Sequence, residues 1–379
     1  MPNYSHLRSQ NVFQHESTIM KYTVLALGGD GIGPEILKAG IDVANAIVEK
    51  TDLELDISYD LIGGICWDKH QTFCQSKTVS AAQKTNAVLV GAVGGPKWDK
   101  LKIDVLPEER DGLMRLRKEM RAFFGMRPAR YYPQLHNQTP YAKGKVENSE
   151  LMVLREMCGG AMFAQPRGIK IEKNQRYAYD TAGYAETEIR QFAVCGFELA
   201  RLRKNRLVSI DKSNVMESYR LWREVVQEVS NEYKDVEVKH LYADNCAFQI
   251  AMDPKKFDIV LACNFLGDLF SDLAGIISGG LGMLPSASLC GPPIGLTKGI
   301  YEPVHGSAPD LIGAGIANPI GMILSVGMMF NYSFGRKDLS NRIEHAVNQV
   351  LESGCVTPDV GGTASTDEVT TKVIKEIQK

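Results

Sequence analysis

Short apolar runs alternate with longer amphipathic segments along most of this chain of 379 residues. The run at residues 22–27 leads through a glycine-rich turn into a helical pattern that extends to residue 50. Runs of this length and apolarity are typical of buried parallel strands. Strands that alternate with helices predict an α/β fold with a largely parallel sheet.

The same pattern predicts further elements along the chain. The segment 111–130 is expected to be helical until Gly125 and Pro128, and the apolar stretch 315–335 is expected to form a buried helix. The C-terminus is expected to hold one amphipathic helix and a short closing element. Strands are predicted within 87–98, 150–160, 206–212, 236–244 and 257–264, and helices within 187–204 and 216–233.

Bulk properties exclude several classes of protein. The net charge of −2 gives no reason to expect a nucleic-acid partner, and no apolar run reaches the roughly 18 residues that a membrane span needs. The eight cysteines form no CxxC pair, which favours free thiols in a reducing cytoplasm. The polar residues 1–19 lack the apolar core of a secretory signal and are expected to form a disordered tail.

The glycine-rich turn at residues 28–35, "GGDGIGPE", tests for a dinucleotide fingerprint. A fingerprint that starts at Gly29 needs glycine at 34, where the chain has proline, and one that starts at Gly28 needs glycine at 30, where it has aspartate. The ordinary Rossmann fold is therefore disfavoured.

Arginines from three separate segments stand out. Several of those within 110–130 fit a solvated helix face, but Arg155 lies at the end of an apolar strand, where a buried guanidinium needs an anionic partner. Guanidinium groups bind carboxylates in bidentate geometry. Arginines from three elements are therefore suited to hold a polycarboxylate.

Two aspartates lie four residues apart in "CNFLGDLFSD", residues 263–272. On a helix, Asp268 and Asp272 share one face. Such a pair can be a solvated face or a helix cap, and it can also supply the hard oxygen ligands that Mg²⁺ prefers. The spacing alone leaves both possibilities open.

A larger set of motifs carries a resemblance. The stretches "GGDGIGPEI", "LREMCGG", "IDKSNVMES", "YADNCAFQI", "NFLGDLFSDLAG" and "YEPVHGSAPDLIGAGIANPIGMILS" resemble, in order, those of the isocitrate/isopropylmalate family of β-decarboxylating dehydrogenases. The likeness runs from about Met20 to the C-terminus. It implies two α/β domains around a cleft, one from residues 20–122 and 280–379 and one from 123–279. It also implies a homodimer with shared active sites.

The resemblance implies an oxidation followed by a decarboxylation. Hydride leaves the C2 alcohol of a substituted malate for NAD, and the 2-oxo acid then loses carbon dioxide. By match, a magnesium or manganese ion binds Asp268, Asp272 and Asp244, the last from the other subunit. Lys212 matches the catalytic lysine that takes the alcohol proton, and Asp244 is expected to assist it. The residues expected to bind the malate carboxylates are Arg117, Arg127 and Arg155.

The predicted pocket for the third substituent is apolar. Leu113, Met114 and Val215 fall where the family holds this group. An apolar wall would leave a third carboxylate desolvated and unpaired, at a cost of several kcal/mol. The expected substrate is therefore 3-isopropylmalate, of leucine biosynthesis, with another 3-alkylmalate or a tartrate-like acid as the alternative.

The glycine-rich loop 305–318 matches the segment that wraps the adenosine end of the cofactor. A carboxylate at Asp310 accepts ribose hydroxyls and repels a 2′-phosphate, which favours NAD over NADP. Glu109 and Asn214 are expected near the nicotinamide. The remaining cofactor-binding residues implied by the resemblance are His305, Gly306, Ser307, Ala308, Pro309 and Asn318.

One position departs from the family pattern. Where the family has "GGxYFG", this chain has "GGAMFAQ", so that Met162 replaces a tyrosine credited with giving a proton after carbon dioxide leaves. A thioether has no proton to give. Water or another group takes over at a cost in rate, or the substrate is a different 2-hydroxy acid, or the chain is a weakly active NAD-binding regulatory paralogue. Sequence alone does not place the nearby Tyr177, Tyr179 and Tyr184.

Overall fold

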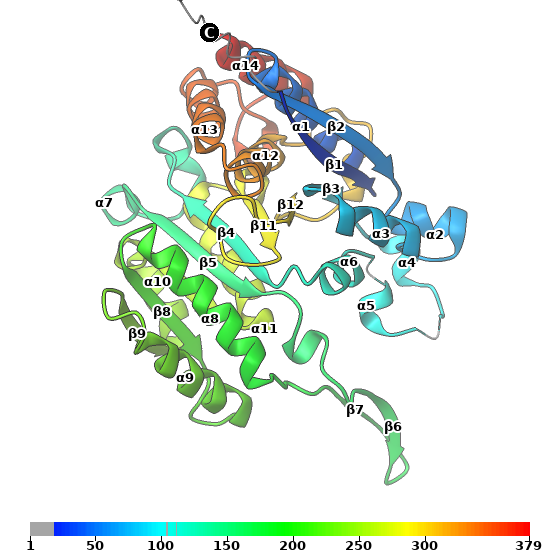
Figure 1. Ribbon diagram of the computed structural model, residues 1–379, viewed down its shortest axis with the longest axis vertical. Helices are drawn as coiled ribbons and strands as arrows, with labels where there is room; N and C mark the ends of the chain where they lie inside the picture. Colours follow the sequence, from blue (N-terminus) through cyan, green and yellow to red (C-terminus); the bar gives the residue numbers. More distant parts are fainter. Residues whose placement is uncertain (1–18, 104, 111) are drawn as a thin grey trace, which may run out of the picture.

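A computed structural model describes residues 19–103, 105–110 and 112–379. Its centre is a ten-stranded sheet of order β2-β1-β3-β12-β11-β4-β5-β10-β8-β9, as Figure 1 shows in ribbon form. The strands are β1 (Met20–Gly29), β2 (Leu53–Asp60), β3 (Ala87–Ala92), β4 (Phe124–Arg130), β5 (Glu150–Glu156), β8 (Arg206–Asp211), β9 (Glu237–Tyr242), β10 (Ile259–Ala262), β11 (Pro285–Leu289) and β12 (Gly299–Pro303).

The sheet joins two sets of strands from different parts of the chain. β1, β2, β3, β11 and β12 come from the two ends of the described chain, and β4, β5, β8, β9 and β10 come from its middle. The outer strands of both sets pair in parallel, whereas the pairings β12–β11, β11–β4 and β4–β5 at the centre are antiparallel. The predicted α/β class with a largely parallel sheet is confirmed.

Helices pack on each set of strands because this contact buries their apolar faces away from water. α12 is buried along almost its whole length against β11 and β12, as its apolar sequence predicts, and α8 and α9 pack together beside β8. The helices are α1 (Gly33–Val48), α2 (Gly64–His70), α3 (Ser76–Lys84), α4 (Pro96–Asp99), α5 (Pro107–Arg110), α6 (Gly112–Met120), α7 (Lys143–Val146), α8 (Glu186–Arg201), α9 (Glu217–Ser230), α10 (Ala243–Met252), α11 (Asn264–Gly275), α12 (Ile320–Tyr332), α13 (Lys337–Glu352) and α14 (Thr366–Gln378).

Some predicted elements differ from the structure. The helix expected as far as Gly125 ends at Met120, because Arg121 adopts a left-handed backbone with φ of 55°, and the chain then enters β4. The short closing element is the full helix α14. β2, β11 and β12 were not predicted. The expected tail, residues 1–19, lies outside the described residues except for Ile19.

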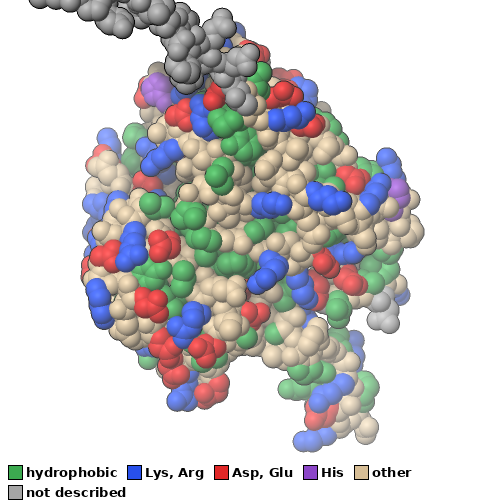
Figure 2. All heavy atoms as spheres, viewed as in Figure 1, with side chains coloured by type: hydrophobic (Ala, Val, Ile, Leu, Met, Phe, Trp, Pro, Cys, Tyr) green, Lys and Arg blue, Asp and Glu red, His purple; other side chains and the backbone are tan. Residues whose placement is uncertain are grey.

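A two-stranded hairpin projects from the body of the molecule. It consists of β6 (Gly168–Glu172) and β7 (Gln175–Tyr179), and its two antiparallel strands belong to no larger sheet. In the space-filling view it stands clear at the lower right, with basic and hydrophobic side chains intermingled (Figure 2). Ile169 and Ile171 are both more than 70% exposed. An isolated two-stranded ribbon is marginally stable in water, so this hairpin is suited to pack against another surface.

All eight cysteines are free, as predicted from their spacing. Within the described part of the chain, no helix is both long and apolar enough to cross a bilayer.

Candidate active site

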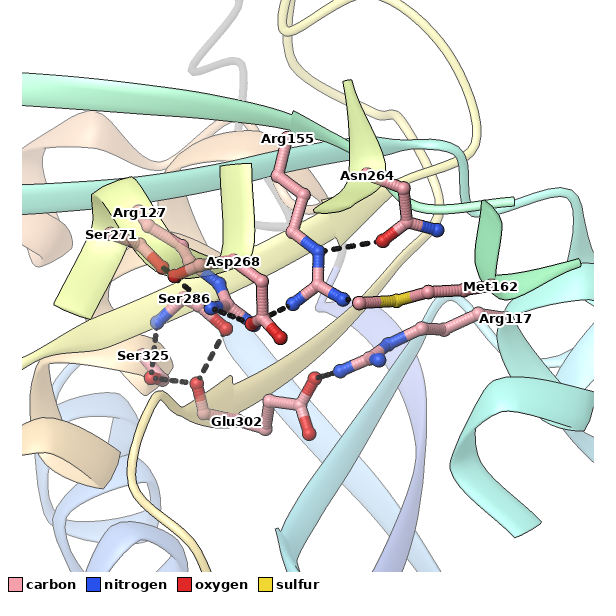
Figure 3. A network of polar contacts seen from close by, with 10 residues as sticks. All are labelled: Arg117, Arg127, Arg155, Met162, Asn264, Asp268, Ser271, Ser286, Glu302 and Ser325. Carbon is pink, nitrogen blue, oxygen red and sulfur yellow. Dashed lines mark hydrogen bonds and ion pairs between the residues drawn. The ribbon is translucent and has the colours of Figure 1, made fainter. Parts of the chain in front are cut away.

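A cluster of charged side chains lies where the two sets of strands meet, and Arg155 is at its centre (Figure 3). Arg155 is the penultimate residue of β5 and is buried. Its Nε donates to Asn264 Oδ1 at 2.9 Å, its Nη1 donates to Asp268 Oδ1, and its Nη2 contacts Met162 Sδ at 3.3 Å. Each guanidinium nitrogen therefore has a different partner.

The two other predicted arginines join this cluster from β4 and α6. Arg127 Nη1 donates to Ser271 Oγ at 2.7 Å and to Asp268 Oδ1 at 3.2 Å, so Asp268 is shared by two arginines. Arg117 is paired with Glu302 of β12. The structure thus brings all three predicted arginines together, as the sequence led us to expect.

The electrostatics of the cluster favour an added anion. Burial, with Arg127 next in importance, lowers the pKa of Arg155 to about 9, and burial together with the neighbouring Arg117 lowers the pKa of Arg127. The Arg127 Nε atom is buried and makes no hydrogen bond in the described structure. A carboxylate bound here would offset the mutual repulsion and supply the missing acceptor.

Asp268 and Asp272 lie one turn apart on α11, as predicted. Desolvation is the main factor that raises the pKa of Asp272, and repulsion from the Asp268 carboxylate raises it further. The positive charges of Arg127 and Arg155 lower this pKa and offset part of the rise. A cation beside these carboxylates would relieve that effect, so the donors fit a hard divalent ion. Within one chain, however, the described residues contain no group of three or more His, Cys, Asp or Glu side chains placed to hold a metal.

Lys212 and Asp244 form a second, separate group on the outer part of the sheet. Lys212 Nζ donates to Asp244 Oδ1 at 2.7 Å, and this bond is the main cause that lowers the pKa of Asp244. Both residues line a largely apolar pocket of about 430 Å³ with Tyr184, Tyr219 and Phe265. In the described structure no hydrogen bond or ion pair links Lys212 or Asp244 to Asp268 or Asp272. One chain alone does not assemble the predicted metal triad.

The predicted cofactor loop lines a pocket of about 590 Å³. His305, Gly306, Ala308 and Asn318 contribute to its wall, and burial lowers the pKa of His305. Ser307 is buried, and its carbonyl accepts from Ile32 N–H at 2.9 Å, which ties the loop to the start of α1. The exposed Pro309 and Asp310 lie in the following turn but do not line the pocket.

The remaining predicted residues divide between the two groups. Leu113 and Met114 lie on α6, three or four residues before Arg117, so this pair is near the arginine cluster. Val215, 69% exposed, and the exposed Asn214 follow Lys212 on the other side. The exposed Glu109 lies on α5, away from the cofactor-loop pocket, and borders a cavity between α5 and the hairpin.

The segment that carries Met162 is a tight turn beneath Tyr184. Gly160 has a φ of +70°, and a Cβ atom added there would lie 2.3 Å from Tyr184 Oη. The turn brings Met162, partly buried, against the Arg155 guanidinium. Tyr177 lies on the exposed hairpin and Tyr179 at its end, whereas Tyr184 packs behind the turn.

Three polar residues of the site were not singled out in the sequence. Glu302 accepts from Arg117, and Asn264 accepts from Arg155. Buried Glu156 accepts from the backbone N–H groups of Cys158 and Gly159, and burial raises its pKa to about 7. A carboxylate directly after a strand arginine in "LREMCGG" was the available signal for Glu156. Glu302 and Asn264 sit in quoted motifs but pair over long sequence separations.

Comparison with known proteins identifies the family of this chain. The profile of the family described as isocitrate/isopropylmalate dehydrogenase matches residues 23–377. A 3-isopropylmalate dehydrogenase of Pseudomonas fluorescens is 44% identical over 92% of this chain and 95% of its own length. One of Pseudomonas putida is 45% identical over 90% and 93%.

Solved structures give the same result. An isocitrate dehydrogenase of Methylococcus capsulatus superposes with a TM-score of 0.83 at 26% identity, covering 94% of this chain and all of that one. A β-decarboxylating dehydrogenase of Thermococcus kodakarensis has a TM-score of 0.76 at 28% identity, covering 94% and 96%. The chain belongs to the isocitrate/isopropylmalate dehydrogenase family.

Proposed function

We propose that this chain is an NAD- and divalent-metal-dependent dehydrogenase. It converts 3-isopropylmalate to 4-methyl-2-oxopentanoate and carbon dioxide in leucine biosynthesis. The observation that carries the proposal is the buried cluster in which Arg127 and Arg155 share the single carboxylate of Asp268. Two buried guanidinium groups that have one ion-pair carboxylate between them match a substrate that brings two carboxylates of its own. The 44% identity to enzymes named for this substrate supports the same conclusion.

Asp268 and Asp272 fit the metal, and Asp244 of the partner subunit completes the set. When bound, Mg²⁺ or Mn²⁺ supplies polarisation of the C2 oxygen and stabilises the negative charge that develops during decarboxylation. Arg127 and Arg155, whose common partner is Asp268, then bind the substrate carboxylates in its place. The Lys212 Nζ of one chain takes the C2 hydroxyl proton in the site of the other.

The branch of the substrate is recognised by an apolar wall. Leu113 and Met114 form one side on α6, and Val215, exposed in the single chain, closes the other side in the dimer. Burial of an isopropyl group against such a wall is favourable, whereas a third carboxylate there would lose its water without gaining a partner. Selection against isocitrate follows from this difference.

A homodimer is required by this arrangement, and the surface of one chain supports it. Phe248 on α10 is 65% exposed, and Leu269 on α11 is 56% exposed. These packed helices lie next to the Lys212 group, and the exposed hairpin follows β5 and precedes β8 along the chain. Large exposed apolar side chains on two adjoining helices are consistent with a protein interface there.

Three finer assignments complete the proposal. The domains are 20–122 with 280–379, and 123–279, which is supported by the division of the strands between the chain ends and its middle. The cofactor is NAD, held by the 305–318 loop, and Asp310 disfavours NADP. Eight free cysteines suit a reducing compartment such as the cytoplasm.

One experiment tests the proposed reaction. The purified protein is offered 3-isopropylmalate, isocitrate, tartrate and malate with NAD or NADP, in magnesium or with a chelator. NADH and carbon dioxide are followed separately. We expect turnover only when 3-isopropylmalate is the acid, NAD is the cofactor and magnesium is present. Turnover of another acid would reassign the substrate, and no turnover at all would favour a regulatory role. NADH without carbon dioxide would show that the chain oxidises the substrate but does not decarboxylate it.

A further inference from the structure

Asn264 joins three segments of the site through its own polar atoms. It is buried and is the first residue of α11. Its Oδ1 accepts from Arg155 Nε at 2.9 Å, and its Nδ2 donates to the Gly159 carbonyl at 3.1 Å. Its backbone N–H donates to Tyr184 Oη at 2.9 Å. Every one of these partners lies far from Asn264 in the sequence, so the side chain is fixed by tertiary structure.

Asn264 and Asp268 together hold one guanidinium group. They lie one turn apart on α11, and they accept from Nε and Nη1 of Arg155 (Figure 3). Because a guanidinium is planar and rigid, a bond at Nε fixes the direction in which both Nη atoms point. Two acceptors on one helix therefore define the plane of Arg155.

The two acceptors have different fates in the proposed reaction. Asp268 is expected to turn to a metal ion, and its bond to Arg155 is then lost or weakened. Asn264 is neutral and has no such second role, and it is also anchored by the Gly159 carbonyl. It is the acceptor that stays with Arg155 when Asp268 changes partner.

We propose that Asn264 is a positioning residue for substrate binding. It holds the Arg155 guanidinium plane so that the Nη atoms face a substrate carboxylate while Asp268 serves the metal. The proposal rests on the proposed function for the identity of that substrate. Its geometric part, the control of Arg155 by Asn264, does not depend on it.

Two substitutions separate the two bonds of the side chain. Asn264→Leu removes both and leaves Arg155 Nε without an acceptor, so we expect the KM for 3-isopropylmalate to rise about 10–100-fold. The KM for NAD should change less than about threefold, because the cofactor loop is not involved. Asn264→Asp keeps an acceptor for Arg155, loses the donor to the Gly159 carbonyl and adds a negative charge beside Arg155. Its KM for 3-isopropylmalate should rise less than that of Asn264→Leu.

A matched control accounts for loss of a structural asparagine. Asn86, partly buried at the start of β3, accepts from Thr23 N–H at 2.9 Å and lies outside the site. Asn86→Leu should lower the melting temperature and leave both KM values unchanged. If Asn264→Leu behaves in the same way, with lower stability and an unchanged KM for 3-isopropylmalate, the positioning role is wrong.

A double-mutant cycle tests whether Asn264 acts through Arg155. Lysine at position 155 has no Nε–H group to donate to Asn264. In the Arg155→Lys background, Asn264→Leu should therefore change substrate affinity less than about threefold. An effect as large as in the wild type would show that Asn264 acts by another route and would overturn the proposal.

Crystal structures keep the test independent of activity. If the wild type turns over none of the acids, the proposed function fails, but the orientation of Arg155 is still observable. In crystals of the Asn264→Leu variant grown with Mg²⁺, which is expected to draw Asp268 away, the guanidinium plane should rotate away from its position in wild-type crystals grown in the same way. An unchanged plane would refute the inference whatever the enzyme's substrate.

Discussion

The arginine cluster and the Lys212–Asp244 pair are both charged groups of the same site, yet they are built differently. Arg155 is buried and has three partners from two segments, α11 and the turn that carries Met162. Lys212 and Asp244 share one ion pair, and the Asp244 side chain is 70% exposed. Exposed ion pairs contribute little to stability, since water screens them and their side chains keep alternative conformations.

This difference indicates what each group still needs. In the arginine cluster, one chain alone supplies the side chains that hold Arg155 in place, and what is still missing there is an anionic ligand. Beyond that ion pair, the pair has a looser contact between Lys212 Nζ and the Tyr242 ring, whose centroid is 5.9 Å away, and it lies beside exposed apolar residues of α10 and α11. We infer that a second copy of the chain supplies the cover that one chain lacks. The following predictions test this contrast.

The largest effect is expected from the cluster. Arg155→Ala removes a charge that binds the substrate and leaves Asp268 with one arginine fewer, so kcat/KM should fall about 10³-fold. Steady-state NADH formation measures this. Arg190, a partly exposed arginine on α8 with two ion pairs, is the matched control, and Arg190→Ala should retain activity. A loss below tenfold at Arg155 would contradict its proposed role.

A mixing experiment tests whether the pair acts across chains. Lys212→Met and Asp268→Asn variants should each be nearly inactive. After the two are unfolded and refolded together, half of the dimers are mixed, and each mixed dimer has one site with both defects and one intact site. Activity should then recover to about a quarter of the wild type. The absence of any recovery, with mixed dimers demonstrated, would place Lys212 and Asp268 in the same chain's site.

A smaller effect is expected from Met162, which contacts Arg155 in the arginine cluster. Met162→Tyr introduces a hydroxyl next to Arg155 and restores a group that can give a proton. We expect the rate of formation of the protonated product, 4-methyl-2-oxopentanoate, to rise by up to about tenfold, since general acids contribute this much or more. Formation of this product is measured against NADH formation. A variant that gains nothing, or that raises only the KM, would argue that this position does not limit the reaction.

The smallest effect concerns stability against pH. The pKa of Glu156 is raised to about 7 in the folded chain, above its ordinary value of 4.5, so the folded state prefers the protonated form. Its contribution to stability is therefore present below pH 4.5 and is lost as the pH rises towards 7. Glu156→Gln should lose stability less steeply over this range, by up to about 3 kcal/mol in total. Urea unfolding at several pH values measures it, and parallel curves would refute it.

The sequence predicted some of these features for local reasons and missed others for non-local ones. The placement of Asp268 and Asp272 on one face follows from helix geometry, and most of the buried strands follow from their apolar runs. Glu302 was missed because its partner Arg117 is 185 residues away. The end of α6 was missed because a left-handed arginine, not a glycine, terminates it. The expectation that Asp244 of a second chain joins Asp268 and Asp272 at the metal came only from the family resemblance, and it stays a prediction.

The crowding at Gly160 limits how this site can change. Tyr184 fills the space that any larger residue at position 160 would need. The backbone path through residues 159–162 therefore does not tolerate a larger residue at position 160. Substitution at position 162 itself remains available, since that side chain points into the site. A laboratory search for faster variants should therefore randomise residue 162 and keep Gly159 and Gly160 unchanged.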